Sequence, residues 1–180
     1  TWGKCKLATA SFGHGINTNL LQLTKGYAII SNGGYDVKPT LIKKETDVYK
    51  KKIITKATSQ KINSILRKIV VTGTAKLENV DGYEIGGKTG TANKTINGVY
   101  TNKKINTFAS VFPISKPQFV FVVLIDEPQI NNSYIYEYRD GSGFKLKGAP
   151  RNTAGWTSVE VAGKIIEKIG PILATKYIEN

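Results

Sequence analysis

The 180-residue chain has 40% hydrophobic and 22% charged residues, a globular mix that excludes wholesale disorder, collagen-like repeats and coiled coil. Its 26 Lys and Arg against 13 Asp and Glu give a net charge of +13, which favours an anionic partner. The longest apolar run, Phe119 to Ile125, is far shorter than the roughly 20 residues of a membrane-spanning helix.

Cys5 and His14 are the single cysteine and the single histidine of the chain. One cysteine excludes an internal disulfide framework and a zinc site of several cysteines, and one histidine excludes a histidine-rich metal site. We therefore expect no metal and no other cofactor, and we expect Cys5 to be a buried or half-buried small hydrophobe.

A first amphipathic helix is predicted from Thr18 to Ile30, where apolar residues recur with helical period. Asn17 or Thr18 is placed to cap its start, and Asn32-Gly33-Gly34 supplies the stop. Asp36 to Ile42 contains a proline and predicts an extended edge segment.

A second helix is predicted to begin at Thr58 or Ser59 and to end at Gly73. Its apolar residues repeat with the spacing of one buried helix face. They are Ile62, Ile65, Leu66, Ile69 and Val70.

Three strands are predicted next. The first is the glycine-interrupted segment Glu84 to Ala92, and the other two are Asn106 to Phe112 and Phe119 to Ile125. The linker 113–117 contains two prolines and indicates an antiparallel hairpin. The polar segment Asp126 to Asn152 predicts a long surface loop.

The last helix is predicted from a capping box, Thr157-Ser158-Val159-Glu160, to a stop at Gly170-Pro171. Helices precede and follow the strands without regular alternation, so the predicted class is α+β. The expected architecture is an antiparallel sheet of three strands with the C-terminal helix packed on it.

The segment Ile85 to Ala92 carries the clearest chemical signal. Glycines in a strand indicate close approach of a ligand or another backbone, and here Gly87 and Gly90 flank Lys88. Thr89 and Thr91, two apart on a strand, present both hydroxyls on one face. Together these groups predict a cradle for a carboxylate; a glycine-rich bulge with an exposed lysine is the plainer alternative.

A nucleotide-binding loop is a competing interpretation, because Gly82 to Thr89 satisfies the spacing G-x-x-x-x-G-K-T. That motif requires a buried strand before it and a helix after it. Thr74 to Asp81 is mostly polar and Thr89 to Gly98 lacks helical period, so ATP or GTP binding is not favoured.

Lys88-Thr89-Gly90, within 87–92, occurs in one chain order with the segments 11–16, 21–23, 31–34, 125–129 and 153–156. In these segments the sequence resembles the division-specific class B penicillin-binding proteins, the septal peptidoglycan D,D-transpeptidases of α-proteobacterial type. Lys88-Thr89-Gly90 is similar to the last of their three signatures, Ser-x-x-Lys, Ser-x-Asn and Lys-Thr-Gly. The resemblance covers nearly the whole chain except Asn131 to Arg151, whose role the sequence leaves open.

This resemblance implies the roles of individual residues. Lys88 would supply positive potential for the terminal carboxylate of a D-Ala-D-Ala stem peptide or a β-lactam. The hydroxyls of Thr89 and Thr91 would bond that carboxylate, and the backbone N–H of Thr91 would serve the oxyanion hole. Gly87 and Gly90 would let the strand lie against the substrate.

The other two signatures are missing. The sole Ser-x-x-Lys, Ser142 to Lys145, follows Lys-Thr-Gly instead of preceding it, and no Ser-x-Asn occurs. We therefore expect residues 1–180 to be the C-terminal portion of a transpeptidase domain, inactive alone, with the serine and an inner-membrane anchor upstream. The resemblance also implies a periplasmic catalytic domain, division-machinery membrane proteins as partners and a partner glycosyltransferase.

Other interpretations remain open at this point. His14, between two glycines, is expected to support a loop structurally, or alternatively to contact substrate or order that loop. A non-catalytic module could dock division proteins through the lysine-rich segment Lys43 to Lys56 or through Asn131 to Arg151. Nucleic-acid binding is not expected, because the run Lys50-Lys51-Lys52 has no recognition motif beside it.

Overall fold

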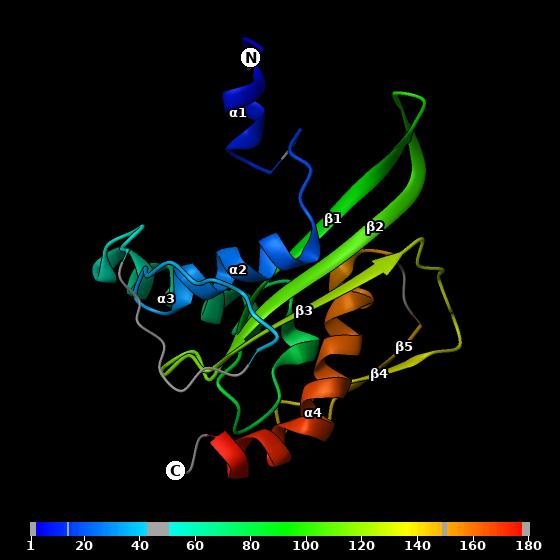
Figure 1. Cartoon of the computed structure of the whole chain (residues 1–180). Coiled ribbons are helices and arrows are strands. Elements are labelled where there is room, and N and C mark those ends of the chain that lie inside the picture. Colours follow the sequence, from blue (N-terminus) through cyan, green and yellow to red (C-terminus); the bar gives the residue numbers. More distant parts are fainter. Residues whose placement is uncertain (1–2, 14, 43–50, 149–150, 178–180) are drawn as a thin grey trace.

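The computed structural model describes residues 3–13, 15–42, 51–148 and 151–177 (Figure 1). Four α-helices, two 3₁₀ helices and five strands are found within these residues. In chain order they are α1 (Lys6–Ala10), α2 (Leu20–Ser31), α3 (Lys56–Val71), η1 (Lys76–Glu78), β1 (Gly86–Ile96), β2 (Val99–Phe112), β3 (Phe119–Asp126), β4 (Ile135–Glu137), β5 (Lys145–Lys147), η2 (Ala154–Trp156) and α4 (Ser158–Tyr177).

The main sheet has three antiparallel strands in the order β1-β2-β3, which confirms the α+β class. The three predicted strands are present, but β1 and β2 are longer than predicted because they meet in a hairpin. Asn97 and Gly98 form its turn with φ of 51° and 78°. Asn-Gly is a strong signal for such a turn, because both residues tolerate positive φ.

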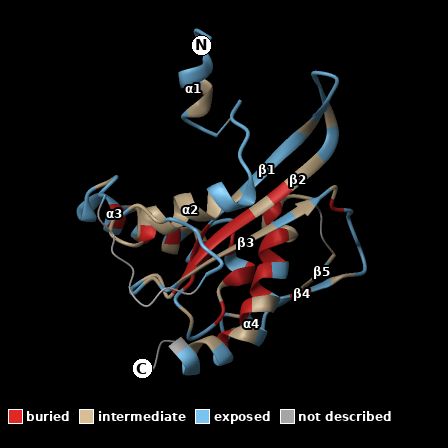
Figure 2. Cartoon of the chain, viewed as in Figure 1, coloured by how far each residue is buried: buried red, intermediate tan, exposed pale blue. Residues whose placement is uncertain are grey.

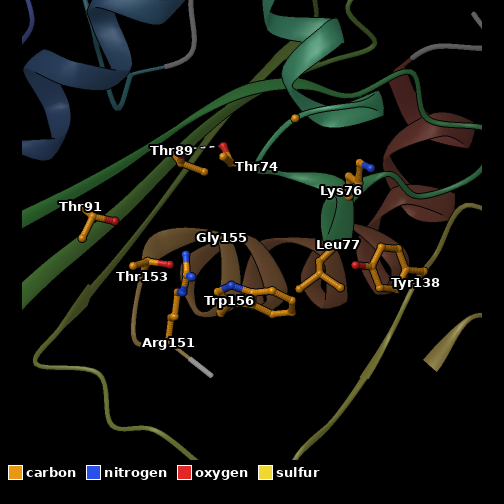
Figure 3. A pocket seen from close by; sticks show the side chains of 11 residues that line it. Thr74, Lys76, Leu77, Thr89, Thr91, Tyr138, Arg151, Thr153, Gly155 and Trp156 are labelled. Atoms are coloured by element: carbon orange, nitrogen blue, oxygen red, sulfur yellow. Dashed lines mark hydrogen bonds between the residues drawn. The ribbon is translucent and has the colours of Figure 1, made fainter. Parts of the chain in front are cut away.

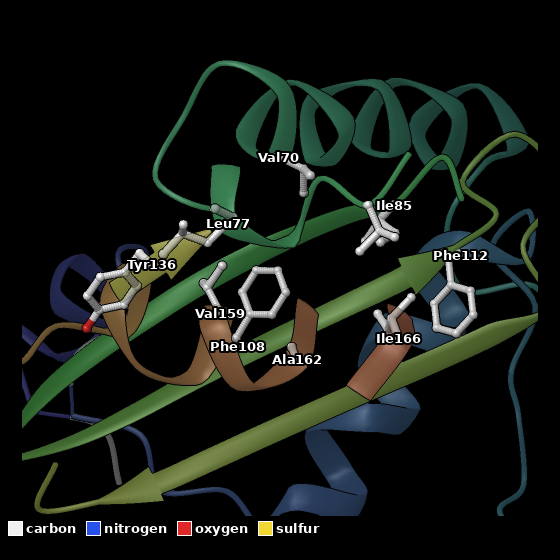
Figure 4. Close-up of a cluster of buried hydrophobic side chains, with 11 residues drawn as sticks. Val70, Leu77, Ile85, Phe108, Phe112, Tyr136, Val159, Ala162 and Ile166 are labelled. Carbon is white, nitrogen blue, oxygen red and sulfur yellow. The ribbon is translucent and has the colours of Figure 1, made fainter. Parts of the chain in front are cut away.

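Helices cover both faces of β2. Phe108 and Phe112 are buried with Val159, Ala162 and Ile166 of α4 in one hydrophobic core (Figure 4). Ala109 and Val111 alternate with these phenylalanines and are also buried, and α2 contacts β2 and β3. Since side chains alternate along a strand, α2 and α4 lie on opposite faces of the sheet. The far end of the β1–β2 hairpin is exposed (Figure 2).

The N-caps of the first two long helices differ from the predicted ones. Asn19, not Asn17 or Thr18, caps α2, in a capping box with Gln22. Thr55, not Thr58 or Ser59, caps α3 by accepting a hydrogen bond from the Thr58 N–H at 3.1 Å. In both cases the cap is the residue whose extended backbone directs its side-chain oxygen to a free N–H of the first turn.

The predicted stop at Gly170-Pro171 is wrong, because α4 continues through Pro171 to Tyr177. Gly170 has another reason to be glycine: an added Cβ would lie 2.5 Å from Tyr83 Cε1. The start of α4 also differs in detail. The Thr157 hydroxyl donates to the Thr153 carbonyl oxygen, and Glu160 pairs with Arg139, so neither side chain forms the predicted capping box.

The expected loop Asp126 to Asn152 contains a second, two-stranded sheet of β4 and β5. Tyr136 of β4 is buried against Trp156, with ring centroids 5.2 Å apart. Arg139 follows β4, and its side chain is only 5% exposed. The buried side chains of Tyr136 and Arg139 make this hairpin part of the core, which the polar sequence of the segment does not predict.

Two further expectations are corrected. Cys5 is exposed, because α1 has no buried residue and projects from the body of the molecule (Figure 1). The segment Asp36 to Ile42 forms no strand; one bridge between Tyr35 and Lys52 lies beside it. Within the residues described, none of the helices has the length and apolarity that crossing a membrane requires.

Glu78 is an anomaly of this core. Its side chain has no exposed surface, and among the described residues neither carboxyl oxygen has a hydrogen-bond partner. Burial raises its pKa well above the ordinary value of 4.5, and the neighbouring Ser110 hydroxyl opposes that shift only in part. A neutral carboxyl is cheaper to bury than a carboxylate, so burial favours the protonated form of Glu78.

Glu78→Gln should gain stability relative to wild type as pH rises above about 4.5. Unfolded Glu78 releases its proton near that pH and folded Glu78 keeps it, so wild-type stability falls with rising pH. The difference in unfolding free energy between variant and wild type should grow steadily from pH 4 to 8, measured by denaturant unfolding. Exposed Asp81→Asn is the control; a gain for Glu78→Gln that does not vary with pH would refute the assignment.

Candidate functional site

A hollow of about 430 Å³ lies beside β1, between η1 and η2 (Figure 3). Its walls come from four separate stretches of the chain: the end of α3 with η1, strand β1, the segment after β4, and the segment leading into α4. The lining residues are Gly73, Thr74, Lys76, Leu77, Thr89, Thr91, Tyr138, Arg151, Thr153, Gly155 and Trp156.

Thr89 and Thr91 both face this hollow, as their spacing predicts. The Thr89 and Thr74 hydroxyl oxygens lie 2.9 Å apart and share one hydrogen bond. The Thr91 hydroxyl oxygen accepts the backbone N–H of Ala154 at 3.0 Å. Each arrangement leaves a hydroxyl hydrogen available, one on the Thr74–Thr89 pair and one on Thr91, so two O–H donors can serve a bound anion.

Lys88 lies on the opposite face of β1 and does not line the hollow. Its ammonium turns back to the strand and donates to the Thr89 carbonyl oxygen at 2.7 Å. Within the described residues β1 has β2 as its one strand neighbour, so this carbonyl points to the edge that carries no strand. The positive charge of Lys88 is therefore held at the edge of the sheet, next to the hollow.

The same contact orients the backbone N–H groups of β1. The N–H and C=O of one residue point to the same side of an antiparallel strand, and alternate residues share that side. Because the Thr89 carbonyl faces the unpaired edge, the N–H of Thr91 faces it too. This edge thus offers a backbone donor beside a lysine ammonium.

The two glycines of the motif meet different surroundings. A Cβ on Gly87 would lie 2.4 Å from Phe108 Cζ and 2.9 Å from the Ala109 carbonyl oxygen, so this residue must be glycine for packing. A Cβ on Gly90 would lie 3.8 Å from its nearest neighbour, the Thr107 carbonyl oxygen. The fold alone therefore does not require glycine at 90.

Asn106 of β2 holds in place the segment that forms the opposite wall of the hollow. It is buried opposite Thr91, and its amide donates to the Asn152 carbonyl oxygen at 2.9 Å and to the Thr157 hydroxyl at 2.7 Å. The stretch between these acceptors includes Ala154, whose N–H reaches Thr91. Segments 87–92 and 153–156, which carry the family resemblance, are therefore adjacent in space.

The outer part of β1 is anchored by ion pairs. Lys94 binds Asp126 at 3.0 Å and Glu127 at 2.8 Å, at the end of β3. Hydrogen bonds to Glu127 and Asp126 raise the pKa of Lys94, and the bonds from Lys94 and Lys103 lower the pKa of Glu127. These acidic residues of the resembling segment 125–129 thus hold β1 in place beside the hollow.

Several other candidates lie elsewhere. Ser142 accepts the Phe144 N–H in a turn, and Lys145 pairs with Glu137, so this Ser-x-x-Lys is not on a helix. His14 lies outside the described residues. Thr89 lies inside strand β1, not at the start of a helix, which rules out the nucleotide-binding loop between Gly82 and Thr89.

Thr74, Lys76 and Arg151 also line the hollow, and no sequence motif predicts this. They lie 15, 13 and 62 positions from Thr89, and no local pattern joins them to it. Trp156 packs on Tyr136 and also lines the hollow.

The family described as the penicillin binding protein transpeptidase domain matches residues 1–142. The chain is 35% identical over 136 residues to the probable peptidoglycan D,D-transpeptidase PenA of Neisseria flavescens, covering 74% of this chain and 34% of that protein. It is 31% identical over 189 aligned positions to the probable peptidoglycan D,D-transpeptidase FtsI of Caulobacter vibrioides, covering 97% of this chain and 29% of that protein.

A solved structure extends the similarity to the fold. The transpeptidase domain of Burkholderia pseudomallei penicillin-binding protein 3 superimposes with a TM-score of 0.76 and 25% identity, over 98% of this chain and 48% of that one. The chain thus spans about a third or less of the two relatives above and about half of this structure.

Thr91→Val should destabilise the protein by about 1–3 kcal/mol, because it leaves the buried Ala154 N–H without its acceptor. Thr91→Ser keeps the hydroxyl and should recover most of that loss. Denaturant unfolding of the three proteins measures the difference. Equal stabilities for the Val and Ser variants would mean that the 3.0 Å contact does not hold segment 153–156 on β1.

Proposed function

We propose that this chain, which belongs to the penicillin-binding protein transpeptidase family, is the C-terminal portion of the catalytic domain of a peptidoglycan D,D-transpeptidase. Its reaction would crosslink D-Ala-D-Ala stem peptides during septal wall synthesis, and β-lactams would acylate the same site. The observation that carries this proposal is the edge of β1, where an ammonium, a backbone N–H and two hydroxyls converge beside a hollow.

The chemistry proposed for this edge is acyl transfer through a serine. The serine oxygen attacks the carbonyl carbon of the penultimate D-Ala, and the terminal D-Ala leaves as an amine that takes up a proton. A second stem peptide then attacks the acyl-enzyme through its amino group, which releases the serine. In each step negative charge develops on the carbonyl oxygen, and the Thr91 N–H would stabilise it.

Binding of the substrate would use the groups around that N–H. The hydroxyls of Thr89 and Thr91 would hold the terminal carboxylate in the hollow that they line. Lys88 would add positive potential at the strand edge, and Gly90 would let the peptide approach the backbone. Gly87 supports the strand through its packing on Phe108. His14 would contact substrate or order its loop.

We place the serine nucleophile on another part of the protein, and we expect residues 1–180 to be inactive alone. Ser142 lacks a lysine partner, since Lys145 pairs with Glu137. We also propose, from the relatives, a membrane-anchored protein with its catalytic domain in the periplasm. Division-machinery membrane proteins and a glycosyltransferase would be its partners.

Lys88→Ala in the complete protein should reduce covalent labelling by a fluorescent penicillin at least tenfold, because the edge loses its cation. Residues 1–180 alone should show no labelling. Gel fluorescence after a timed reaction measures both. Labelling of Lys88→Ala at the wild-type rate would remove Lys88 from the site, and labelling of residues 1–180 would place the nucleophile within them.

Gly90→Ala and Gly87→Ala separate substrate approach from packing. Gly90→Ala should leave stability within about 1 kcal/mol of wild type, because its Cβ would make only ordinary van der Waals contact with Thr107, but should slow acylation if peptide backbone lies against β1. Gly87→Ala should lower stability by more than 1 kcal/mol, because its Cβ would overlap Phe108. Thermal unfolding measures the stability of each variant, and penicillin labelling measures its rate of acylation. Unchanged labelling of Gly90→Ala would contradict the proposed approach.

A further inference from the structure

The hollow beside β1 is positively charged, and Lys88 is not the source. Of its lining residues within the described chain none is acidic, whereas Lys76 and Arg151 are both cationic. The Lys88 side chain lies on the other face of β1, and its ammonium donates to the Thr89 carbonyl oxygen. An anion in the hollow would therefore meet Lys76 and Arg151 before it met Lys88.

Arg151 comes from the segment that β2 anchors. It precedes Asn152, whose carbonyl oxygen and side chain are both bound by strand β2, through Asn106 at 2.9 Å and Lys104 at 2.7 Å. In Figure 3 the Arg151 side chain extends between Thr153 and Trp156, and Lys76 lies toward Leu77 and Tyr138. The two cations thus occupy different parts of one hollow.

The threonines supply hydrogen bonds to this space but no charge. Thr91 and the Thr74–Thr89 pair can each donate one O–H, which satisfies two of the four lone pairs of a carboxylate. A guanidinium adds two parallel N–H donors and the compensating positive charge. Trp156 and Tyr138 contribute apolar surface, as in pockets for small peptides.

We propose that Arg151 is a specificity residue of this hollow, binding the terminal carboxylate that the Thr89 and Thr91 hydroxyls also contact, with Lys76 adding positive potential. The ligand class is a short peptide with a free carboxyl end, and the inference rests on the proposed transpeptidase function. Arg151 selects a charged peptide end over a neutral one, whereas Lys88 acts at the strand edge where the reacting carbonyl lies.

The test compares two probes on the complete protein: an N-acetylated peptide that ends in D-Ala-D-Ala, and the same peptide with its C-terminus amidated. NMR titration gives the dissociation constant of each. Arg151→Gln should weaken binding of the carboxylate peptide about tenfold and leave the amide peptide unchanged, because only the former loses a charge-assisted bond. Lys76→Gln should have a smaller effect of the same kind.

Arg151→Lys and Lys116→Gln are the matched variants. Lysine keeps the charge but not the paired donors, so Arg151→Lys should fall between wild type and Arg151→Gln. Lys116 is exposed in the β2–β3 linker, and its loss should change neither constant. If Arg151→Gln preferred the carboxylate peptide to the amide peptide as strongly as the wild-type protein does, the inference would be overturned.

Penicillin acylation, measured separately, distinguishes this failure from failure of the proposed function. A wild-type protein that is never acylated would reject the transpeptidase proposal, whatever the peptide titrations give. If the wild-type protein is acylated but Arg151→Gln does not change the peptide preference, only the inference about Arg151 is rejected.

Discussion

The buried guanidinium of Arg139 joins three parts of the chain that are far apart in sequence. It donates to the Leu77 carbonyl oxygen of η1 at 2.8 Å, to the Glu137 carbonyl oxygen of β4 at 3.2 Å, and to Glu160 of α4 at 2.9 and 3.0 Å. A carbonyl, a strand end and a helix carboxylate are thus fixed around one planar cation. Burial disfavours its charge, but the contacts with Glu160 and Glu167 hold the pKa of Arg139 above its usual value.

The hollow beside β1 depends on this junction. Leu77, whose carbonyl oxygen Arg139 binds, and Tyr138, which precedes Arg139, form one end of the hollow, and α4 begins just beyond the other. A buried ion pair gives little net stability over a hydrophobic replacement, yet loss of one partner leaves an uncompensated charge. We infer that Arg139 acts mainly by fixing the relative positions of η1, β4 and α4, and that it thereby sets the shape of the hollow.

The sequence predicted the parts of the molecule that follow a local period or a short motif. Strands around Phe108 and Phe121, the long helices and the common face of Thr89 and Thr91 are of this kind. The sequence did not predict the features that depend on a contact between distant parts of the chain. Gly170 indicates a helix stop by itself, but it is glycine because Tyr83 packs on it. Arg139 looks like one more surface cation until Glu160, 21 positions later, is placed beside it.

The candidate site shows the same division. The Lys-Thr-Gly motif located β1, but the opposite wall is segment 151–156, which Asn106 of β2 holds by binding Asn152 and Thr157. No spacing rule links an asparagine in a strand to an arginine 45 positions later. An unpaired strand edge normally invites unwanted pairing, and a lysine on the edge opposes it. Lys88 has that position here, with its ammonium on the Thr89 carbonyl oxygen. An extended peptide that paired with β1 would have to share or displace this ammonium, and the Thr91 N–H points to the same edge as a donor. The lysine that protects the edge therefore also places its charge where a peptide backbone would pair.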